Sequence, residues 1–313
     1  MRRTLCLFVA SFVILFSAVP SVAQVDVVMA GKWGEFGSKP GQFKFPAMIV
    51  ADRSANVYVV DQHNHRIQKF DSAGNFILMW GKFGTEPGQF NYPYGIAIDS
   101  KGDVYVSDMN NNRIQKFSSD GEYLLSAGAY GSADDQFKYP YGIAIDGHDH
   151  LYVIDAFNYR IKKLDSRLKF LSQWGSQESI GIKLYMPHEI AVAKNGTLIL
   201  TDRQNHRVSI FTTEGKLVER FGEFGEGDGL KGSQFSEPHG IAISATGDIF
   251  ICDRYNFRIQ KFSASKEFQT QWVTTATFED SRYFPLGITI GPGGMVYVTD
   301  HYDHSVHIYK IRK

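Results

Sequence analysis

Short runs of alternating apolar and polar residues fill most of the chain, and turn-forming residues separate them. One representative stretch holds four such runs, at residues 94–98, 103–107, 113–117 and 123–127. Apolar side chains that recur with a period of two over about five positions are typical of strands joined by hairpins. Gly, Asp and Asn bound these runs, and no stretch has the spacing of an amphipathic helix. The pattern therefore predicts consecutive antiparallel strands.

This four-strand pattern repeats at a nearly constant interval. The segment Tyr92-Pro-Tyr-Gly-Ile-Ala-Ile-Asp99 recurs word for word at residues 139–146, a shift of 47. The prolines at the same place in each copy are Pro46, Pro93, Pro140, Pro187, Pro238 and Pro285. One interval is 51 residues instead of 47, and the glycine-rich segment 225–232 accounts for the difference. A period of about 40–50 residues is that of β-propeller blades, so six copies predict six blades.

The two ends of the chain complement each other. The sixth copy ends with its third strand near Lys310, while residues 32–37 align with residues 79–84 at the shift of 47. We therefore predict an all-β, six-bladed β-propeller of four-stranded blades, in which the N-terminal residues 27–37 complete the last blade and close the ring. The predicted copies are residues 41–87, 88–134, 135–181, 182–232, 233–279 and 280–313.

The first residues have the pattern of a secretory signal peptide. Two arginines precede an apolar run at residues 5–16, and Ser21 and Ala23 take the small-residue positions before a cleavage site. The run is shorter than the roughly 20 residues that a membrane-spanning helix needs. We therefore expect residues 1–23 to be removed and residues 24–313 to form a secreted or periplasmic protein with no membrane span.

Composition narrows the classes of function. The chain has 33 basic and 33 acidic residues, and the expected mature segment keeps 31 of the former and 33 of the latter, a net charge of −2. That charge opposes binding driven by nucleic-acid phosphates or by anionic membranes. Removal of Cys6 leaves Cys252 as the single cysteine. No intramolecular disulfide is then expected, and Cys252, within an apolar run, is predicted to be a buried small side chain.

A polar frame of Asp, Asn and Arg recurs in five of the six copies. Its aspartates and arginines are Asp61, Arg66, Asp108, Arg113, Asp155, Arg160, Asp202, Arg207, Asp253 and Arg258. The sixth copy has Ser305 where the others have arginine. A catalytic group is rarely needed five times around a ring, whereas Asp and Arg can brace neighbouring strands, and Asn suits the left-handed position of a turn. We interpret the frame as structural.

The residue after each repeat proline varies, and it opens the innermost strand of its copy. These residues are Ala47, Tyr94, Tyr141, His188, His239 and Leu286. Six such side chains should ring one mouth of the central channel, where two histidines beside two tyrosines could bind a metal or position a proton donor. A catalytic zinc normally takes three protein ligands, so a third would have to come from elsewhere, for instance Glu189. The alternative is that these side chains line a wet channel mouth.

The loops between the second and third strands should open on the same face as this mouth. They carry histidine and aromatic residues beside Asn and Arg, as recognition surfaces do. The predicted ligand-binding face consists of Tyr94, Tyr141, His63, His65, Phe157, Tyr159, His206, Tyr255, Phe257, Tyr302 and His304. If this face carries chemistry, Tyr255 with Arg254 is the catalytic candidate. His148 and His150 lie in a turn on the opposite face, where we expect them to be solvated.

The repeat resembles the NHL repeat. The motifs that carry the resemblance are Pro-x-Gly-Ile-Ala-Ile-Asp, Val-Tyr-Val-x-Asp, Asn-x-Arg-Ile-Gln-Lys-Phe and Asp-Gly, and the resemblance extends over all six copies. The family includes extracellular sensor domains, RNA-binding domains and a zinc-dependent peptidyl-α-hydroxyglycine α-amidating lyase. In that lyase, histidines in Pro-His-x-Ile/Leu contexts hold zinc. The resemblance therefore implies His188 and His239 as zinc ligands, with zinc and calcium as cofactors, although the third histidine of the pattern is missing here.

Two functions remain open. One is an exported, non-catalytic and monomeric propeller that binds a protein, peptide or glycan on the predicted face and needs no cofactor. The other is a metal-dependent lyase in which His188 and His239 hold the metal. Binding of nucleic acid, as in intracellular members of the family, is opposed by the expected export and by the net charge.

Overall fold

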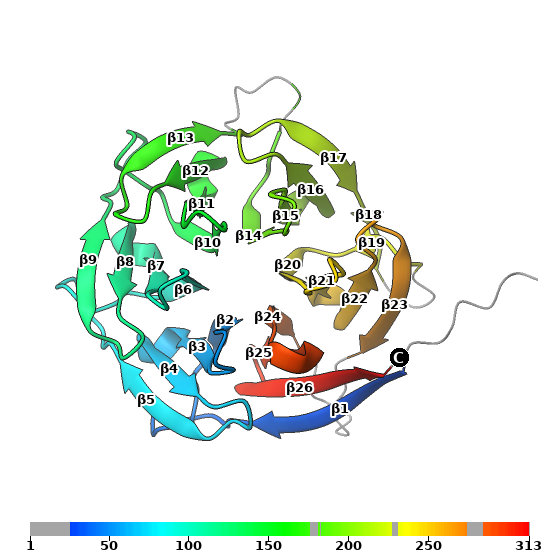
Figure 1. The fold of residues 1–313 in the computed structure, drawn as a ribbon, viewed down its shortest axis with the longest axis horizontal. Helices are drawn as coiled ribbons and strands as arrows, with labels where there is room; N and C mark the ends of the chain where they lie inside the picture. The colour runs from blue at the N-terminus through cyan, green and yellow to red at the C-terminus, as the bar shows by residue number, and fades with distance from the viewer. Residues whose placement is uncertain (1–25, 176–180, 182, 227–230, 274–283, 313) are drawn as a thin grey trace, which may run out of the picture.

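A computed structural model describes residues 26–175, 181, 183–226, 231–273 and 284–312. The predicted signal peptide, residues 1–23, lies outside the described residues. Six four-stranded antiparallel sheets surround a central axis, as Figure 1 shows. In each sheet the first strand lies innermost and the fourth lies at the periphery. The structure confirms the predicted all-β, six-bladed propeller.

Each of the first five blades is built from four consecutive strands. Blade 1 consists of β2 (Pro46–Ala51), β3 (Val57–Asp61), β4 (Arg66–Phe70) and β5 (Phe76–Trp80). Blade 2 consists of β6 (Pro93–Ile98), β7 (Val104–Asp108), β8 (Arg113–Phe117) and β9 (Tyr123–Ala127). Blade 3 consists of β10 (Pro140–Ile145), β11 (Leu151–Asp155), β12 (Arg160–Leu164) and β13 (Phe170–Trp174).

The remaining blades follow the same plan. Blade 4 consists of β14 (Pro187–Val192), β15 (Leu198–Asp202), β16 (Arg207–Phe211) and β17 (Leu217–Phe221). A short parallel pair, β18 (Glu223–Phe224) and β19 (Gln234–Phe235), leads to the next blade. Blade 5 consists of β20 (Pro238–Ile243), β21 (Ile249–Asp253), β22 (Arg258–Phe262) and β23 (Phe268–Val273). Blade 6 consists of β24 (Pro285–Ile290), β25 (Met295–Asp300), β26 (Ser305–Arg312) and β1 (Asp26–Trp33).

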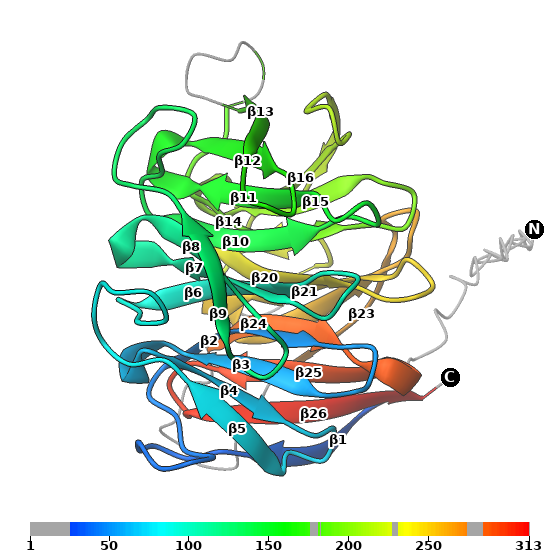
Figure 2. The same ribbon diagram turned by 60° about the vertical axis from the view of Figure 1, so that its left-hand side comes forward.

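Strand β1 closes the ring, as the sequence predicts. It pairs antiparallel with β26, and the sheet order is β1-β26-β25-β24. Figures 1 and 2 show the blue first strand beside the red last strand. The strand ends at Trp33, earlier than the predicted residue 37, because Gly34 takes a φ of 94° and turns the chain. The first and last parts of the chain thus share one sheet.

Short 3-10 turns follow the second strand in each of the first five blades. They are η1 (Gln62–Asn64), η2 (Met109–Asn111), η3 (Ala156–Asn158), η4 (Arg203–Asn205) and η5 (Arg254–Asn256). A sixth, η6 (Pro292–Gly294), lies between β24 and β25. The innermost strand of each blade begins at the same end, as the pairing of Pro93 with Asp108 shows. We call this end, formed by η1–η5 and the residues that follow the repeat prolines, the turn face.

Apolar side chains fill the spaces between adjacent blades. The cluster between blades 5 and 6 contains Phe250, Ile259 and Tyr309, all buried. Cys252 belongs to this cluster, is free and fully buried, and so has the position expected for a small apolar side chain. Within the described part of the chain, no helix has the length and hydrophobicity that a membrane crossing requires.

The innermost strands of neighbouring blades approach each other at glycine. A Cβ on Gly95 would lie 2.3 Å from the carbonyl oxygen of Tyr141 in the next blade. Gly95→Ala should therefore shift backbone and lower the free energy of unfolding by about 2–3 kcal/mol in urea denaturation. Gly147→Ala is the matched control, because a Cβ there meets nothing within 4 Å. Equal losses in the two variants would contradict this account.

Candidate functional site

The Asp, Asn and Arg frame ties each 3-10 turn to the segment that enters the innermost strand. In blade 1, Oδ2 of Asp61 accepts hydrogen bonds from Arg66 Nε at 2.6 Å and from Asn64 Nδ2 at 2.9 Å. Its Oδ1 accepts from the amide of Lys44 at 2.8 Å, just before the innermost strand. The ion pair recurs in blades 2 to 5 with N–O distances of 2.7–2.9 Å. The turn face therefore rests on five ion pairs, each with a fully buried aspartate.

The left-handed position of each turn differs from the prediction. The asparagine lies inside the 3-10 turn and donates to the aspartate, and the residue after it has the positive φ. These residues are His65, Asn112, Tyr159, His206, Phe257 and His304, with φ of 51–55°. Such a φ is unfavourable for most side chains. The next blade compensates in part, since the amide of Tyr92 donates to Nδ1 of His65 at 3.2 Å.

The same contact recurs at two other predicted face histidines. The amide of Glu237 donates to Nδ1 of His206 at 3.1 Å, and that of Phe45 donates to Nδ1 of His304 at 3.0 Å. These imidazoles join neighbouring blades, a role that spacing in the sequence did not indicate. Whether they also contact a ligand stays a prediction.

Aromatic side chains at the turn tips project from the turn face. Tyr302 is 51% exposed, Phe157 43% and Tyr255 41%. His63 at the same position of blade 1 is exposed, and its ring lies 4.5 Å from that of Phe45. Exposed apolar side chains that group on one face are typical of binding sites. The prediction of an aromatic face is consistent with these positions.

A second group of exposed aromatic residues borders the turn face and was not predicted. Phe36, Phe83, Tyr130 and Phe224 are 58–65% exposed. Three of these rings lie beside a left-handed histidine, with centroid distances of 4.7–5.0 Å. The first three positions recur at the shift of 47, a signal that the sequence carries but that we used only to align strands.

Four of the predicted channel residues meet at the centre of the turn face. The ring centroids of Tyr94 and Tyr141 are 5.0 Å apart, those of Tyr94 and His188 are 5.0 Å apart, and those of His188 and His239 are 3.9 Å apart. The Tyr94 hydroxyl lies 3.1 Å from the His188 ring nitrogens. His188 and His239 are 3% and 1% exposed. The rings form a packed floor and not the wet lining that the sequence left open.

Two arginines place positive charge beside the packed rings of this floor. Arg254 Nη1 donates to Nε2 of His239 at 2.9 Å, and Nδ1 of His239 lies 2.8 Å from the carbonyl oxygen of Glu237. Arg203 donates to the Glu237 carboxylate through Nε at 2.7 Å. Burial lowers the pKa of His188 and of His239 well below the ordinary value, and the positive charges of both arginines lower it further. Both imidazoles are therefore neutral at pH 7.

This arrangement does not fit the zinc site that the resemblance implies. A zinc ligand must direct a nitrogen lone pair at the ion, but Nε2 of His239 already accepts from a guanidinium cation. Moreover His188, His239 and Glu189 are not among the described residues that bring three ligand atoms within 4.8 Å of one another. Zinc and calcium at this place stay predictions that the geometry does not favour, and we derive no step through either ion.

Glu189 lies in the channel next to this floor. The channel cavity, of about 230 Å³, is lined mostly by Ile, Val and Ala of the six innermost strands. One oxygen of the Glu189 carboxyl accepts from the amide of Ile190 at 3.3 Å, while Oε2 has no hydrogen-bond partner among the described residues. Burial raises the pKa of this carboxyl to about 8, so it is largely protonated at neutral pH.

The acid–base candidates Tyr255 and Arg254 are neighbours that point in different directions. The guanidinium of Arg254 lies 5.3 Å from the Tyr255 ring centre and reaches inward to His239, whereas Tyr255 is 41% exposed. Neither side chain lines the channel cavity. A catalytic role for the pair stays a prediction.

The repeats match a known family model. The model of the NHL repeat matches residues 90–117, 184–211, 235–262 and 283–309. Each match extends over the first three strands of one blade, with the Asp, Asn and Arg frame in all but the last. Four of the six blades of this propeller are therefore NHL repeats. Blades 1 and 3 of this NHL-repeat propeller continue the same pattern at the same spacing.

Curated relatives match the NHL-repeat propeller over short segments. The protein brain tumor of Drosophila melanogaster is 30% identical over 92 residues, which are 29% of this chain and 8% of that protein. The B-box type zinc finger protein ncl-1 of Caenorhabditis elegans is 38% identical over 60 residues, 18% of this chain and 7% of that protein. The matched segments are thus a small part of these much longer relatives.

Solved structures share the fold of the NHL-repeat propeller over most of its length. A streptogramin B lyase matches with a TM-score of 0.63 and 16% identity over 92% of this chain and 98% of its own. A protein of unknown function from Bacteroides thetaiotaomicron matches with a TM-score of 0.68 and 16% identity, over 92% of this chain and 76% of its own. A gluconolactonase from Xanthomonas campestris matches with a TM-score of 0.67 and 11% identity, over 93% of this chain and 91% of its own. Identities this low show the fold alone.

Proposed function

We propose that this NHL-repeat propeller is exported and binds a protein, peptide or glycan ligand on its turn face. The observation that carries the proposal is the set of exposed aromatic tips in blades 3, 5 and 6, Phe157, Tyr255 and Tyr302, each 41–51% exposed. Aromatic anchors supply much of the energy of binding surfaces, and large exposed rings mark such surfaces. The export part rests on the signal-peptide pattern of residues 1–23 and makes the protein secreted or periplasmic.

The frame beneath the tips supports this role. Each 3-10 turn is anchored by a carboxylate that receives donors from its own blade and from the preceding loop, as Asp253 does from Arg258 and from the amide of Ser236. Side chains presented on such a fixed backbone lose little conformational entropy when a ligand binds. A rigid ring with variable tips is therefore suited to recognition.

Arg254 adds a polar element near the centre of the turn face. Its guanidinium carbon lies 5.3 Å from the Tyr255 ring centre and 5.7 Å from that of Phe284, so the two rings hold its plane in place. A held guanidinium donates well to oxygen acceptors. Rings at the tips and a donor at the centre suit a ligand with flat apolar groups and carbonyl, carboxylate or hydroxyl oxygens, as peptides and glycans have. The lyase alternative gains no support here, because the same arginine occupies Nε2 of His239.

The test replaces three tips together, Phe157→Ala, Tyr255→Ala and Tyr302→Ala. We expect the unchanged propeller to capture particular members of a peptide library or glycan array, and the triple variant to bind them at least about 100-fold more weakly, since each aromatic anchor contributes about 1 kcal/mol or more. The matched control replaces Ile77, Leu124 and Leu171, which are 45–46% exposed on the peripheral strands. Unchanged capture by the tip variant would contradict binding at the turn face.

A further inference from the structure

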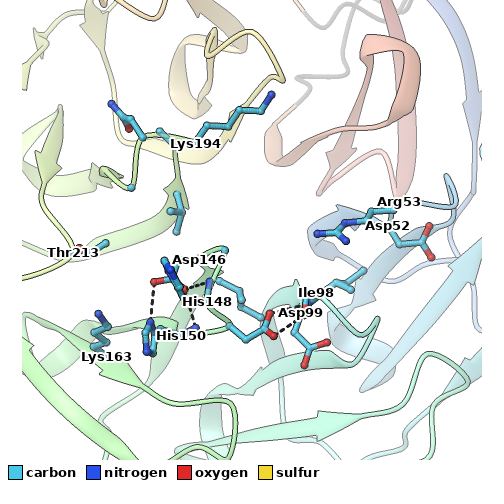
Figure 3. Close-up of a pocket in the computed structure, with 18 of the residues that line it drawn as sticks. Asp52, Arg53, Ile98, Asp99, Asp146, His148, His150, Lys163, Lys194 and Thr213 are labelled. Atoms are coloured by element: carbon cyan, nitrogen blue, oxygen red, sulfur yellow. Dashed lines mark hydrogen bonds and ion pairs between the residues drawn. The ribbon is translucent and has the colours of Figure 1, made fainter.

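Three possible metal ligands gather on the face opposite the turn face. Asp146, His148 and His150 belong to the turn between β10 and β11, and one ligand atom from each lies within 4.8 Å of the others. In the described ranges this is the only such group of three. Figure 3 shows the three side chains together on the wall of a pocket of about 860 Å³.

The turn fixes Asp146 without any ion. Its Oδ1 accepts from the amides of His148 and His150 at 2.9 and 3.0 Å, and its Oδ2 accepts from the Tyr152 hydroxyl at 2.9 Å. Nδ1 of His150 lies 3.1 Å from the same Oδ2. The carboxylate and the His150 imidazole are therefore already side by side, which the expectation of two solvated histidines did not include, whereas His148 is exposed as expected.

Other blades show that the turn itself does not require two histidines. In blade 1, Asp52 Oδ1 accepts from the amides of Ser54 and Asn56, both at 2.8 Å, and Asn56 Nδ2 donates to Asp52 Oδ2 at 2.8 Å. An amide side chain thus braces this turn as well as an imidazole does. In blade 3 the exposed ring of His148 adds a second imidazole, 6.1 Å from the ring of His150. The pair goes beyond what the turn needs.

We propose that Asp146, His148 and His150 bind one divalent ion of the zinc class. Two imidazole nitrogens and one carboxylate oxygen are a donor set that zinc accepts, whereas Mg²⁺ and Ca²⁺ prefer sites built of oxygen. Zinc binds these ligands at about 2.0–2.2 Å, so the three atoms must draw closer than 4.8 Å. The ion would take the place of the contact between His150 Nδ1 and Asp146 Oδ2, which already lie 3.1 Å apart, and the exposed His148 side chain would rotate toward them.

Three protein ligands leave a fourth position, and the pocket gives water access to it. Lys163 and Lys194 line the same pocket in Figure 3, together with Asp52 and Asp99. The site lies at the opposite end of the innermost strand from the tips of the turn face. It is therefore independent of the proposed ligand-binding function, and either can fail without the other.

The test is calorimetric titration of zinc into the full chain, purified without a polyhistidine tag, with the metal content checked by elemental mass spectrometry. We expect one zinc ion per chain. His148→Ala should weaken zinc binding by more than about tenfold. Loss of a residue that only supports a metal ligand already costs about that much, and His148 is a ligand itself. Because His148 is exposed, this variant should keep the thermal unfolding midpoint of the unchanged chain.

Two further measurements separate this site from other places. His239→Ala, at the floor of the turn face, should retain the zinc, and Co²⁺ in place of zinc should give a visible absorption that changes in His148→Ala. Absence of zinc binding by the unchanged chain would overturn the proposal. So would equal affinity in His148→Ala, and so would loss of zinc in His239→Ala, which would place the ion in the channel.

Discussion

Replacing Asp253 by alanine is expected to lower the free energy of unfolding by about 3–5 kcal/mol, because the change leaves a buried arginine without its counter-charge. The Asp253 side chain is fully buried, and its Oδ2 receives Arg258 Nε at 2.7 Å. The amide of Ser236 donates to Oδ1 at 2.8 Å. Both donors would lose a partner in a place where water does not replace it. Urea denaturation of Asp253→Ala beside the unchanged chain measures the loss.

Blade 6 supplies the control. Asp300 takes the same place but faces Ser305 instead of arginine, and its Oδ1 accepts from the amides of Tyr302 and Asp303. Asp300→Ala should therefore cost only about 1–2 kcal/mol. Adding Arg258→Met to Asp253→Ala should recover part of the larger loss, because it removes the unpaired charge. A loss in Asp300→Ala as large as in Asp253→Ala would exclude the ion pair as its source.

Lowering the pH from 7 to 5 is expected to destabilise the propeller through its buried histidines. Burial depresses the pKa of His301 to about 4 and the pKa of His188 and of His239 well below the ordinary value. A histidine in the unfolded chain has a pKa of about 6.5, so a lower pKa in the folded protein stabilises the fold at pH values above about 6.5. This stabilisation is lost as the pH falls from there toward the pKa of the folded protein. At pH 5 the cost is about 2 kcal/mol for His301 and has the same sign for His188 and His239.

Glu189 acts in the opposite direction. Burial raises its pKa from 4.5 to about 8, so its contribution is present at low pH and is lost as the pH rises. Between pH 7 and pH 5 it returns about 2–3 kcal/mol, which offsets part of what the three histidines lose. For these four groups together the expectation is a loss of stability, because three histidines oppose one carboxyl.

Two variants separate the opposing contributions. His239→Gln should make the loss between pH 7 and pH 5 smaller, and Glu189→Gln should make it larger by about 2–3 kcal/mol. Urea denaturation of each variant at both pH values measures the differences. If both substitutions changed the pH dependence in the same direction, the assignment of the two opposing groups would be wrong.

The fold could be predicted from the sequence because each blade must satisfy the same contacts. Asp61 and Arg66 recur at fixed spacing since every turn needs the same ion pair, and the missing fourth strand of the last copy indicated ring closure. The contacts at the centre of the turn face left no such record. The hydrogen bond from Arg254 to His239 depends on two rotamers that the repeat does not constrain.

Local conformation limited the prediction in a different way. Spacing placed Asn64 at the turn but could not show that the next residue, His65, takes the left-handed conformation. A hydrogen bond from the following blade makes this histidine acceptable there, and that partner is 27 residues away. Likewise, Asp146 and His150 come into contact because the turn between them folds back on itself. The prediction that the polar residues of this turn are solvated did not include that contact.

Ring closure by β1 and β26 also has a mechanical consequence. Asp26 pairs with Arg312 and Trp33 with Val306, so the two ends of the described chain leave the same end of this strand pair. A force that pulls the ends apart would load the backbone hydrogen bonds one after another, as in opening a zipper, and would not shear them all at once. The ring is therefore weak against tension between its own ends, while tethering both ends to a common support puts no strain on it.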